Sequence, residues 1–179
     1  MSTTATGGST MIDRMIRAAK LENAVYEEVE HDQSATVQAF WVVVIASVAA
    51  GIGGLGAGLT GLIVGVIAAL VGWAAYAYVC YWIGTRVLAG PQTSATWGQL
   101  LRTLGFASSP RVLLVLAFIP VIGLLLAIVV LIWTFLTTVV AIRQALDFDT
   151  GRAIVTAIAG WAVLFLTTVV VAALVAGAM

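Results

Sequence analysis

The sequence has few of the residues that carry chemistry. Only 9% of its 179 residues are charged, and it has one cysteine and one histidine. A single cysteine, Cys80, excludes an internal disulfide and a cysteine-based zinc cluster. The one histidine, His31, cannot by itself assemble a nucleophile, a base and an orienting group. We therefore expect no enzyme, metal or cofactor, and the formal net charge of zero argues against nucleic acid as a partner.

Apolar residues dominate instead. They make up 62% of the chain, with a mean hydropathy of +1.12, whereas soluble domains are about 45–50% apolar. A membrane-spanning helix needs about 20 consecutive apolar residues, and several uncharged runs are long enough. These runs predict an all-α polytopic membrane helix bundle, embedded in the lipid bilayer, with five transmembrane segments. We expect the spans at about 37–56, 61–83, 110–120, 124–144 and 153–176.

The N-terminal region divides into a tail and an amphipathic segment. Residues 1–9 are small and polar and predict a disordered tail. Over residues 10–31 apolar side chains recur at helical spacing, which predicts one amphipathic helix on the cytoplasmic side. Arg14, Arg17 and Lys20 fall on its polar face and are candidates for contact with lipid head groups or a partner. The same pattern fits a helix on the membrane surface and a helix packed on the rest of the protein.

Glycines separate the first two predicted spans. The glycine-rich stretch 54–61 predicts the turn of a tight helical hairpin. Gly54 with Gly58, and Gly61 with Gly65, form pairs of small residues four apart, which let helix backbones approach closely. We expect these glycines to pack inside the bundle, and a dimer contact is the alternative.

A short interfacial helix is predicted in the middle of the chain. Thr96 and Gln99 have the spacing of a capping box, and apolar residues recur at helical spacing behind them. Arg102 lies on the polar side of this helix and is a further candidate for head-group contact. Ser109 and Pro110 then predict the cap and first turn of the third span.

The uncharged run between Arg111 and Arg143 contains Pro120 and Gly123, which predict either a kink or a reversal. A reversal places every Lys and Arg on one side of the membrane, as the positive-inside rule favours. We therefore predict a turn at Pro120 and Gly123. The third span is then only about ten residues, or about 15 Å of α-helix, and needs shielding by its neighbours.

A charged loop joins the last two spans. Arg143, Asp147, Asp149 and Arg152 predict helix capping and surface ion pairs more readily than a binding site. Arg143 can pair with Asp147 if the fourth helix extends that far. No predicted span carries a charge away from its ends, so a proton relay or an ion-coordinating carboxylate is not expected.

Several blocks of the sequence share a pattern with a known family. They are YEEVE at 26–30, AGIG at 50–53, LRTLGFASSP at 101–110, FIPVIG at 118–123, Trp133, AIRQAL at 141–146 and Arg152-Ala153. Together they resemble bacterial members of the Yip family of membrane proteins. The resemblance implies five spans and a cytoplasmic N-terminus, without a catalytic signature. Eukaryotic members are associated with Rab-type GTPases, vesicle traffic and membrane shaping, but the polar glycine-proline signature near their first spans is missing here.

Three functions follow from these patterns, in decreasing order of support. The first is a non-catalytic scaffold or membrane-organising protein in the bacterial inner membrane, with its C-terminus on the side opposite the N-terminus. The second is an accessory subunit of a larger membrane complex, for example an energy-transducing one. The third is a channel or transporter of unknown substrate. Expected partners are other membrane proteins or a second copy of the chain.

Overall fold

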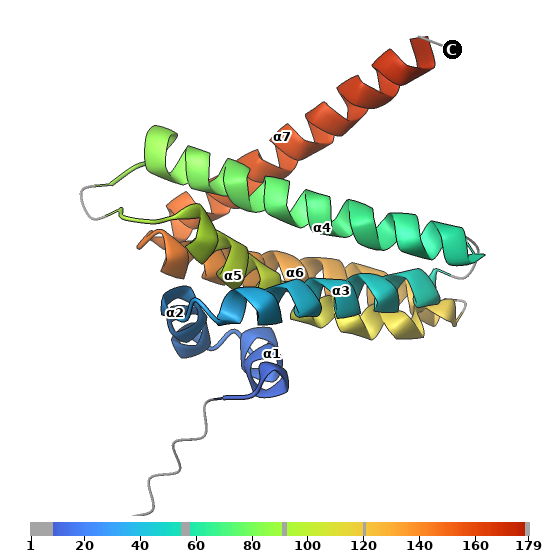
Figure 1. The fold of residues 1–179 in the computed structure, drawn as a ribbon, viewed down its shortest axis with the longest axis horizontal. Coiled ribbons are helices and arrows are strands. Elements are labelled where there is room, and N and C mark those ends of the chain that lie inside the picture. The colour runs from blue at the N-terminus through green and yellow to red at the C-terminus, as the bar shows by residue number, and fades with distance from the viewer. Residues whose placement is uncertain (1–8, 55–57, 91–92, 120, 178–179) are drawn as a thin grey trace, which may run out of the picture.

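The computed structural model describes residues 9–54, 58–90, 93–119 and 121–177, with side chains as far as Leu166. All regular structure in these residues is helical, and the long helices lie side by side as a bundle (Figure 1). The predicted all-α polytopic bundle is therefore confirmed. The elements are α1 Met11–Ala19, α2 Asn23–His31, α3 Ala35–Gly53, α4 Gly58–Trp82, η1 Ile83–Val87, α5 Trp97–Ala107, η2 Ser109–Phe118, α6 Ile122–Ala145 and α7 Thr150–Gly177.

Four helical segments are long and apolar enough to cross a membrane. They are Ala35–Gly53, Gly58–Val87, Trp97–Phe118 and Ile122–Ala145. The region of the predicted fifth span is α7, which is apolar over Thr150–Leu166 and continues as a helix to Gly177. Figure 1 shows α7 crossing the bundle and leaving it toward the C-terminus.

The N-terminal region forms two helices, so the prediction of one helix over 10–31 is wrong. Helix α1 ends at Ala19, and the chain turns at Leu21, which has a positive φ of 63°. Apolar periodicity continued across this break, which is why the sequence pattern did not reveal it. Of the predicted tail, residues 1–8 lie outside the described residues, whereas Ser9 donates a hydrogen bond to Glu28.

The third span differs from the prediction because the interfacial helix and the short span form one helical segment. The capping box of Thr96 and Gln99 begins α5, and η2 follows after Ser108, which takes the cap position expected for Ser109. Most of α5 from Leu100 onward is buried inside the protein. The ten residues of η2 form a 3₁₀-helix, which rises about 2.0 Å per residue and therefore reaches about 20 Å.

The chain reverses direction between η2 and α6, as predicted (Figure 1). The amide of Gly123 donates to Ile119 O at 2.7 Å, and Val121 has a positive φ of 68°. A Cβ at Gly123 would collide with the backbone carbonyl of Ala117, so this turn requires glycine. Pro120, the other predicted turn residue, lies outside the described residues.

Two of the four predicted packing glycines, Gly58 and Gly65, do not pack against another helix. Gly54 caps α3, Gly61 lies in the first turns of α4, and a Cβ at Gly58 or Gly65 would have no other residue within 4 Å. The close approaches occur elsewhere. A Cβ at Gly53 would collide with Leu114 O, one at Gly105 would come within 2.6 Å of the Ala39 Cβ, and one at Gly160 within 2.8 Å of the Tyr76 ring. Spacing of four residues alone does not identify which helix face meets a neighbour.

Candidate functional site

Arg14 anchors the two N-terminal helices to the bundle. Its guanidinium donates to Glu28 Oε1 at 2.9 Å, Asp32 Oδ2 at 2.8 Å and Gln38 Oε1 at 3.0 Å. Only 6% of Arg14 is exposed. These contacts join α1, the end of α2 and the first turn of α3. The guanidinium is thus held inside the protein, which corrects the expectation that it faces lipid head groups.

Arg102, in α5, also holds the N-terminal helices against the bundle. Its Nε donates to Val29 O at 2.8 Å, and Nη2 donates to Glu30 O. These are carbonyls of the last turn of α2, which an α-helix leaves without intrahelical partners. Arg102 is 8% exposed, so it also lacks the exposure that a lipid head-group contact requires. Its positive charge instead meets the negative end of the α2 dipole.

The carboxylates around Arg14 respond to it electrostatically. Burial favours a raised pKa for Glu28, but hydrogen bonds from Ser9, Arg17 and Arg14 outweigh that effect and lower the pKa. Hydrogen bonds from the Ser34 side chain and from Arg14 lower the pKa of Asp32. Both groups are therefore charged at neutral pH and bind the guanidinium as ion pairs.

The remaining predicted contact residues at this end differ in exposure. Arg17 pairs with Asp13, Glu22 and Glu28, at 3.5, 3.2 and 2.8 Å. Lys20 is exposed and has no ion pair among the described residues. Its contact with lipid or a partner stays a prediction.

The charged loop caps and braces helices. Asp149 Oδ1 accepts from the amide of Arg152 at 3.0 Å, which caps α7, and Asp149 Oδ2 lies 3.5 Å from Arg152 Nε. The pair expected between Arg143 and Asp147 does not form. Helix α6 ends at Ala145, Asp147 has a positive φ of 52°, and Arg143 donates to Asn23 Oδ1 at 2.7 Å instead.

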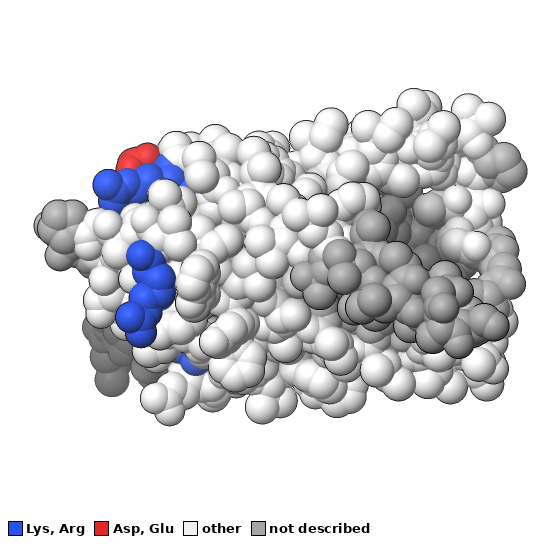
Figure 2. Space-filling model, turned by 90° about the horizontal axis from the view of Figure 1, so that it is seen from above, with Lys and Arg blue, Asp and Glu red and all other residues white. Residues whose placement is uncertain are grey.

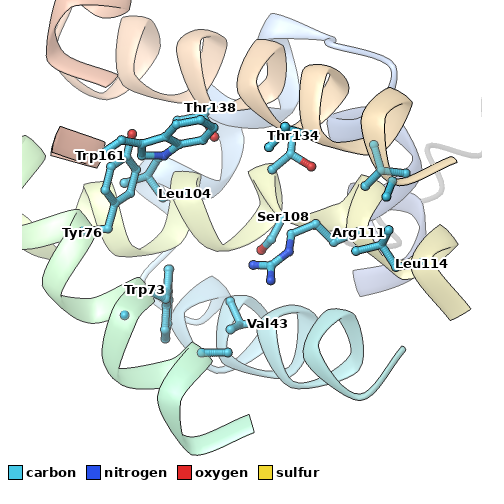
Figure 3. Close-up of a pocket in the computed structure, with 15 residues that line it drawn as sticks. Val43, Trp73, Tyr76, Leu104, Ser108, Arg111, Leu114, Thr134, Thr138 and Trp161 are labelled. Atoms are coloured by element: carbon cyan, nitrogen blue, oxygen red, sulfur yellow. The ribbon is translucent and has the colours of Figure 1, made fainter. Parts of the chain in front are cut away.

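A cavity of about 490 Å³ lies in the middle of the bundle, between α3, α4, α5, η2, α6 and α7 (Figure 3). Most of its wall is apolar. Two aromatic side chains on the wall already use their polar atoms, because Trp73 Nε1 donates to Leu101 O at 3.1 Å and Tyr76 Oη donates to Ala157 O at 3.1 Å. The lining residues are Val43, Ala69, Gly72, Trp73, Tyr76, Leu104, Ser108, Arg111, Leu114, Ala127, Val130, Leu131, Thr134, Thr138 and Trp161.

Arg111 is the unexpected member of this wall. Sequence reasoning placed it at the entrance of a short third span, but the structure places it well inside Trp97–Phe118. Figure 3 shows its guanidinium reaching into the space between the helices. No hydrogen bond or ion pair of this guanidinium is present among the described residues. On the facing wall, the buried Thr134 Oγ1 also has no hydrogen-bond partner within the described part of the chain.

Charged residues are concentrated at one end of the molecule and are scarce in the candidate membrane spans. On the face seen in Figure 2, Lys and Arg lie toward one end with acidic atoms beside them, and the rest of the described surface on that face is uncharged. All eight acidic residues are outside the four candidate spans. Within the described residues, no group of three or more His, Cys, Asp or Glu could hold a metal ion. A missing acidic partner in the neighbouring spans was the sequence signal that could have identified Arg111.

Comparison with known proteins identifies the family. No curated protein and no solved structure matches the chain significantly. The family model of the Yip1 domain matches residues 22–172, which include every helix after α1 for most or all of its length. The origin of the chain in the bacterial branch stays a prediction. With most of its length matched by this domain, the chain belongs to the Yip family of membrane proteins.

Proposed function

We propose that this Yip-family protein is a non-catalytic scaffold that organises the membrane around it. The observation that supports the proposal most is the way α1 is held. Arg14 fixes this short amphipathic helix to α2 and α3, and yet Ile12 and Ile16 are 64% and 51% exposed. An amphipathic helix at fixed depth, with apolar side chains outward, can insert them between lipid head groups and chains.

The charged end of the bundle, formed by Arg14, Arg17, Arg102, Asp149 and their partners, has a structural role. Arg102 and Asp149 cap helices, and Arg14 and Arg17 form ion pairs with neighbouring carboxylates. These groups hold helix ends in place, so the charged end acts as a rigid frame for α1. A scaffold needs such a rigid frame, because α1 can deform the bilayer only if its position relative to the bundle is fixed.

Reconstitution into liposomes tests the proposal. At rising protein density, the wild-type protein should narrow the vesicle diameter measured by electron cryomicroscopy. Replacing both exposed residues, Ile12→Gln and Ile16→Gln, should restore the diameter of protein-free vesicles. Asp13→Asn, on the polar side of the same helix, serves as the matched control and should behave like wild type. Wild-type protein that leaves vesicle diameter unchanged would contradict the proposal.

The proposed location is the cell membrane, with the N-terminus and the charged end in the cytoplasm and the C-terminus on the opposite side. The positive-inside rule supports this orientation. Ile122 is 55% exposed at the opposite end, beside the reversal. A single cysteine at this position, in a Cys80-free background, should react with an impermeant reagent in intact cells. Protection at Ile122 together with labelling near Asp149 would reverse the orientation.

An accessory subunit of a larger membrane complex is the second candidate. It is favoured by α4, where Gly58 and Gly65 have no other residue within 4 Å of an added Cβ. Such open glycines let a foreign helix approach closely. This function predicts a fixed stoichiometry with partners after gentle solubilisation, whereas a lone monomer in native mass measurements would exclude a stable complex.

A further inference from the structure

We propose that the mid-bundle cavity is a binding site for an anionic amphiphile, whose carboxylate or phosphate meets Arg111 and whose apolar chain lies along the cavity wall. This site is independent of the scaffold proposal, because it lies inside the bundle and involves neither α1 nor the charged end. The inference rests on a permanent charge without a counter-charge, an unpartnered hydroxyl and an apolar space beside them.

The charge of Arg111 needs a partner that the described chain does not provide. A guanidinium stays protonated in proteins, and an unpaired charge in an apolar bundle is costly. Arg14 and Arg102 show how this chain satisfies buried arginines, by carboxylates and by helix carbonyls respectively. Among the described residues, Arg111 forms no hydrogen bond or ion pair with such an acceptor, and the acidic residues of the chain lie outside the candidate spans. A bound anion would supply the missing acceptor.

The facing wall offers a second polar contact. Thr134 lines the same cavity from α6, and its Oγ1 has no hydrogen-bond partner among the described residues. By contrast, the hydroxyl of Thr137, one turn further along α6, donates to Ala107 O at 2.7 Å. A guanidinium only donates hydrogen bonds, and a hydroxyl can donate one. The two groups together therefore select a ligand group that accepts, and the positive charge favours an anionic acceptor.

The rest of the cavity selects for an apolar body. The polar atoms of Trp73 and Tyr76 are already bonded to backbone carbonyls, and Ser108 Oγ donates to Gly105 O. Side chains such as Leu104, Leu114 and Val130 supply most of the remaining wall. The volume of about 490 Å³ is within the range of about 300–1,000 Å³ that small-molecule sites occupy. A small inorganic anion would leave this apolar space empty, whereas a single-chain amphiphile would fill it.

Binding measurements on the full-length protein in a non-ionic detergent test the site. The probes are palmitate, 1-palmitoylglycerol 3-phosphate, the neutral hexadecanol, and the chain-free anions acetate and inorganic phosphate. We expect one equivalent of an anionic amphiphile in native mass spectra. Hexadecanol, acetate and phosphate should bind at least about tenfold more weakly, because each lacks one half of the recognition. The tighter of the two anionic amphiphiles identifies the head group.

Variants connect binding to the named residues. Arg111→Met should weaken amphiphile binding about 10- to 100-fold, the range expected for loss of a hydrogen bond to a charged group. Arg111→Lys keeps the charge and should lie between that variant and wild type, and it serves as the test if Arg111→Met does not fold. Arg86→Met, at an exposed arginine in η1, is the matched control and should bind like wild type. Thr134→Val should weaken binding severalfold.

Three results would overturn the site. The first is that Arg111→Met binds the amphiphile as tightly as wild type or, if Arg111→Met does not fold, that both Arg111→Lys and Thr134→Val do so. The second is hexadecanol, acetate or phosphate binding as tightly as the anionic amphiphiles, and the third is a wild-type protein that binds none of the probes. None of these results bears on vesicle diameter, so the scaffold proposal stands or falls separately.

Discussion

Arg102 and Arg111 lie in the same helical segment, Trp97–Phe118, but the fold treats them in opposite ways. Arg102 turns toward the end of α2 and binds two of its carbonyls, whereas Arg111 faces the cavity with no partner among the described residues. An arginine in an apolar bundle is thus structural where helix ends supply acceptors. Where they do not, it marks a place for a ligand.

The largest expected effect comes from making the same substitution at both arginines and comparing the free energies of unfolding. Arg102→Met should lower the free energy of unfolding by about 3 kcal/mol, because buried carbonyls of α2 lose their charged donor. Arg111→Met, in protein freed of amphiphiles, should change it by less than about 1 kcal/mol and toward greater stability, because an unpaired charge is removed. Denaturant titration in detergent measures both. Equal losses at the two positions would show that Arg111 has a structural partner.

A second test concerns the ion pairs that hold α1. Arg14→Met should cost about 2 kcal/mol, less than a fully buried pair, because Glu28 and Asp32 are about one third exposed. The loss should be local, so hydrogen exchange should speed up in α1 and much less in α6. Arg17→Met is the control, since the more exposed ion pairs of Arg17 contribute less than about 1 kcal/mol. Uniform acceleration along the whole chain would contradict a local anchor.

Acidity should loosen the charged end and leave the cavity unchanged. The pKa values of Glu28 and Asp32 are lowered in the folded protein, so their contribution is full above the unfolded pKa of about 4. It is lost as the pH falls below that value and through the folded pKa values. Burial raises the pKa of Glu30, which acts in the opposite direction and offsets part of the loss.

The pH effect is isolated by comparing variants. The difference in thermal midpoint between wild type and Arg14→Met should shrink progressively as the pH falls below about 4, because protonation of Glu28 and Asp32 removes the ion pairs that only wild type can form. Thr137→Val is the control, because this substitution is far from these carboxylates. The difference in thermal midpoint between wild type and Thr137→Val should stay constant over the same pH range. A constant difference for Arg14→Met would mean that its carboxylates do not control α1.

The contrast between the two arginines also explains how far the sequence alone could lead. Hydropathy and charge placement predicted the bundle, the reversal near Gly123 and the caps at Thr96 and Asp149, because these depend on local pattern. The fates of Arg14, Arg102 and Arg111 depend on which helix each faces, and that is set by tertiary packing. For the same reason glycine spacing pointed to Gly58 and Gly65, while Gly53 and Gly105 make the close contacts.

The smallest expected effect comes from two threonines one turn apart on α6. Thr137→Val should cost about 1 kcal/mol, because the buried Thr137 hydroxyl donates to Ala107 O. Thr134→Val keeps the same shape and removes a hydroxyl that has no partner in the described chain, so the free energy of unfolding should stay the same or rise slightly. A saturating anionic amphiphile should then distinguish the two variants in a second way, by how much it raises the free energy of unfolding. The ligand should stabilise wild type and Thr137→Val alike but Thr134→Val less, since Thr134 lines the cavity and Thr137 does not.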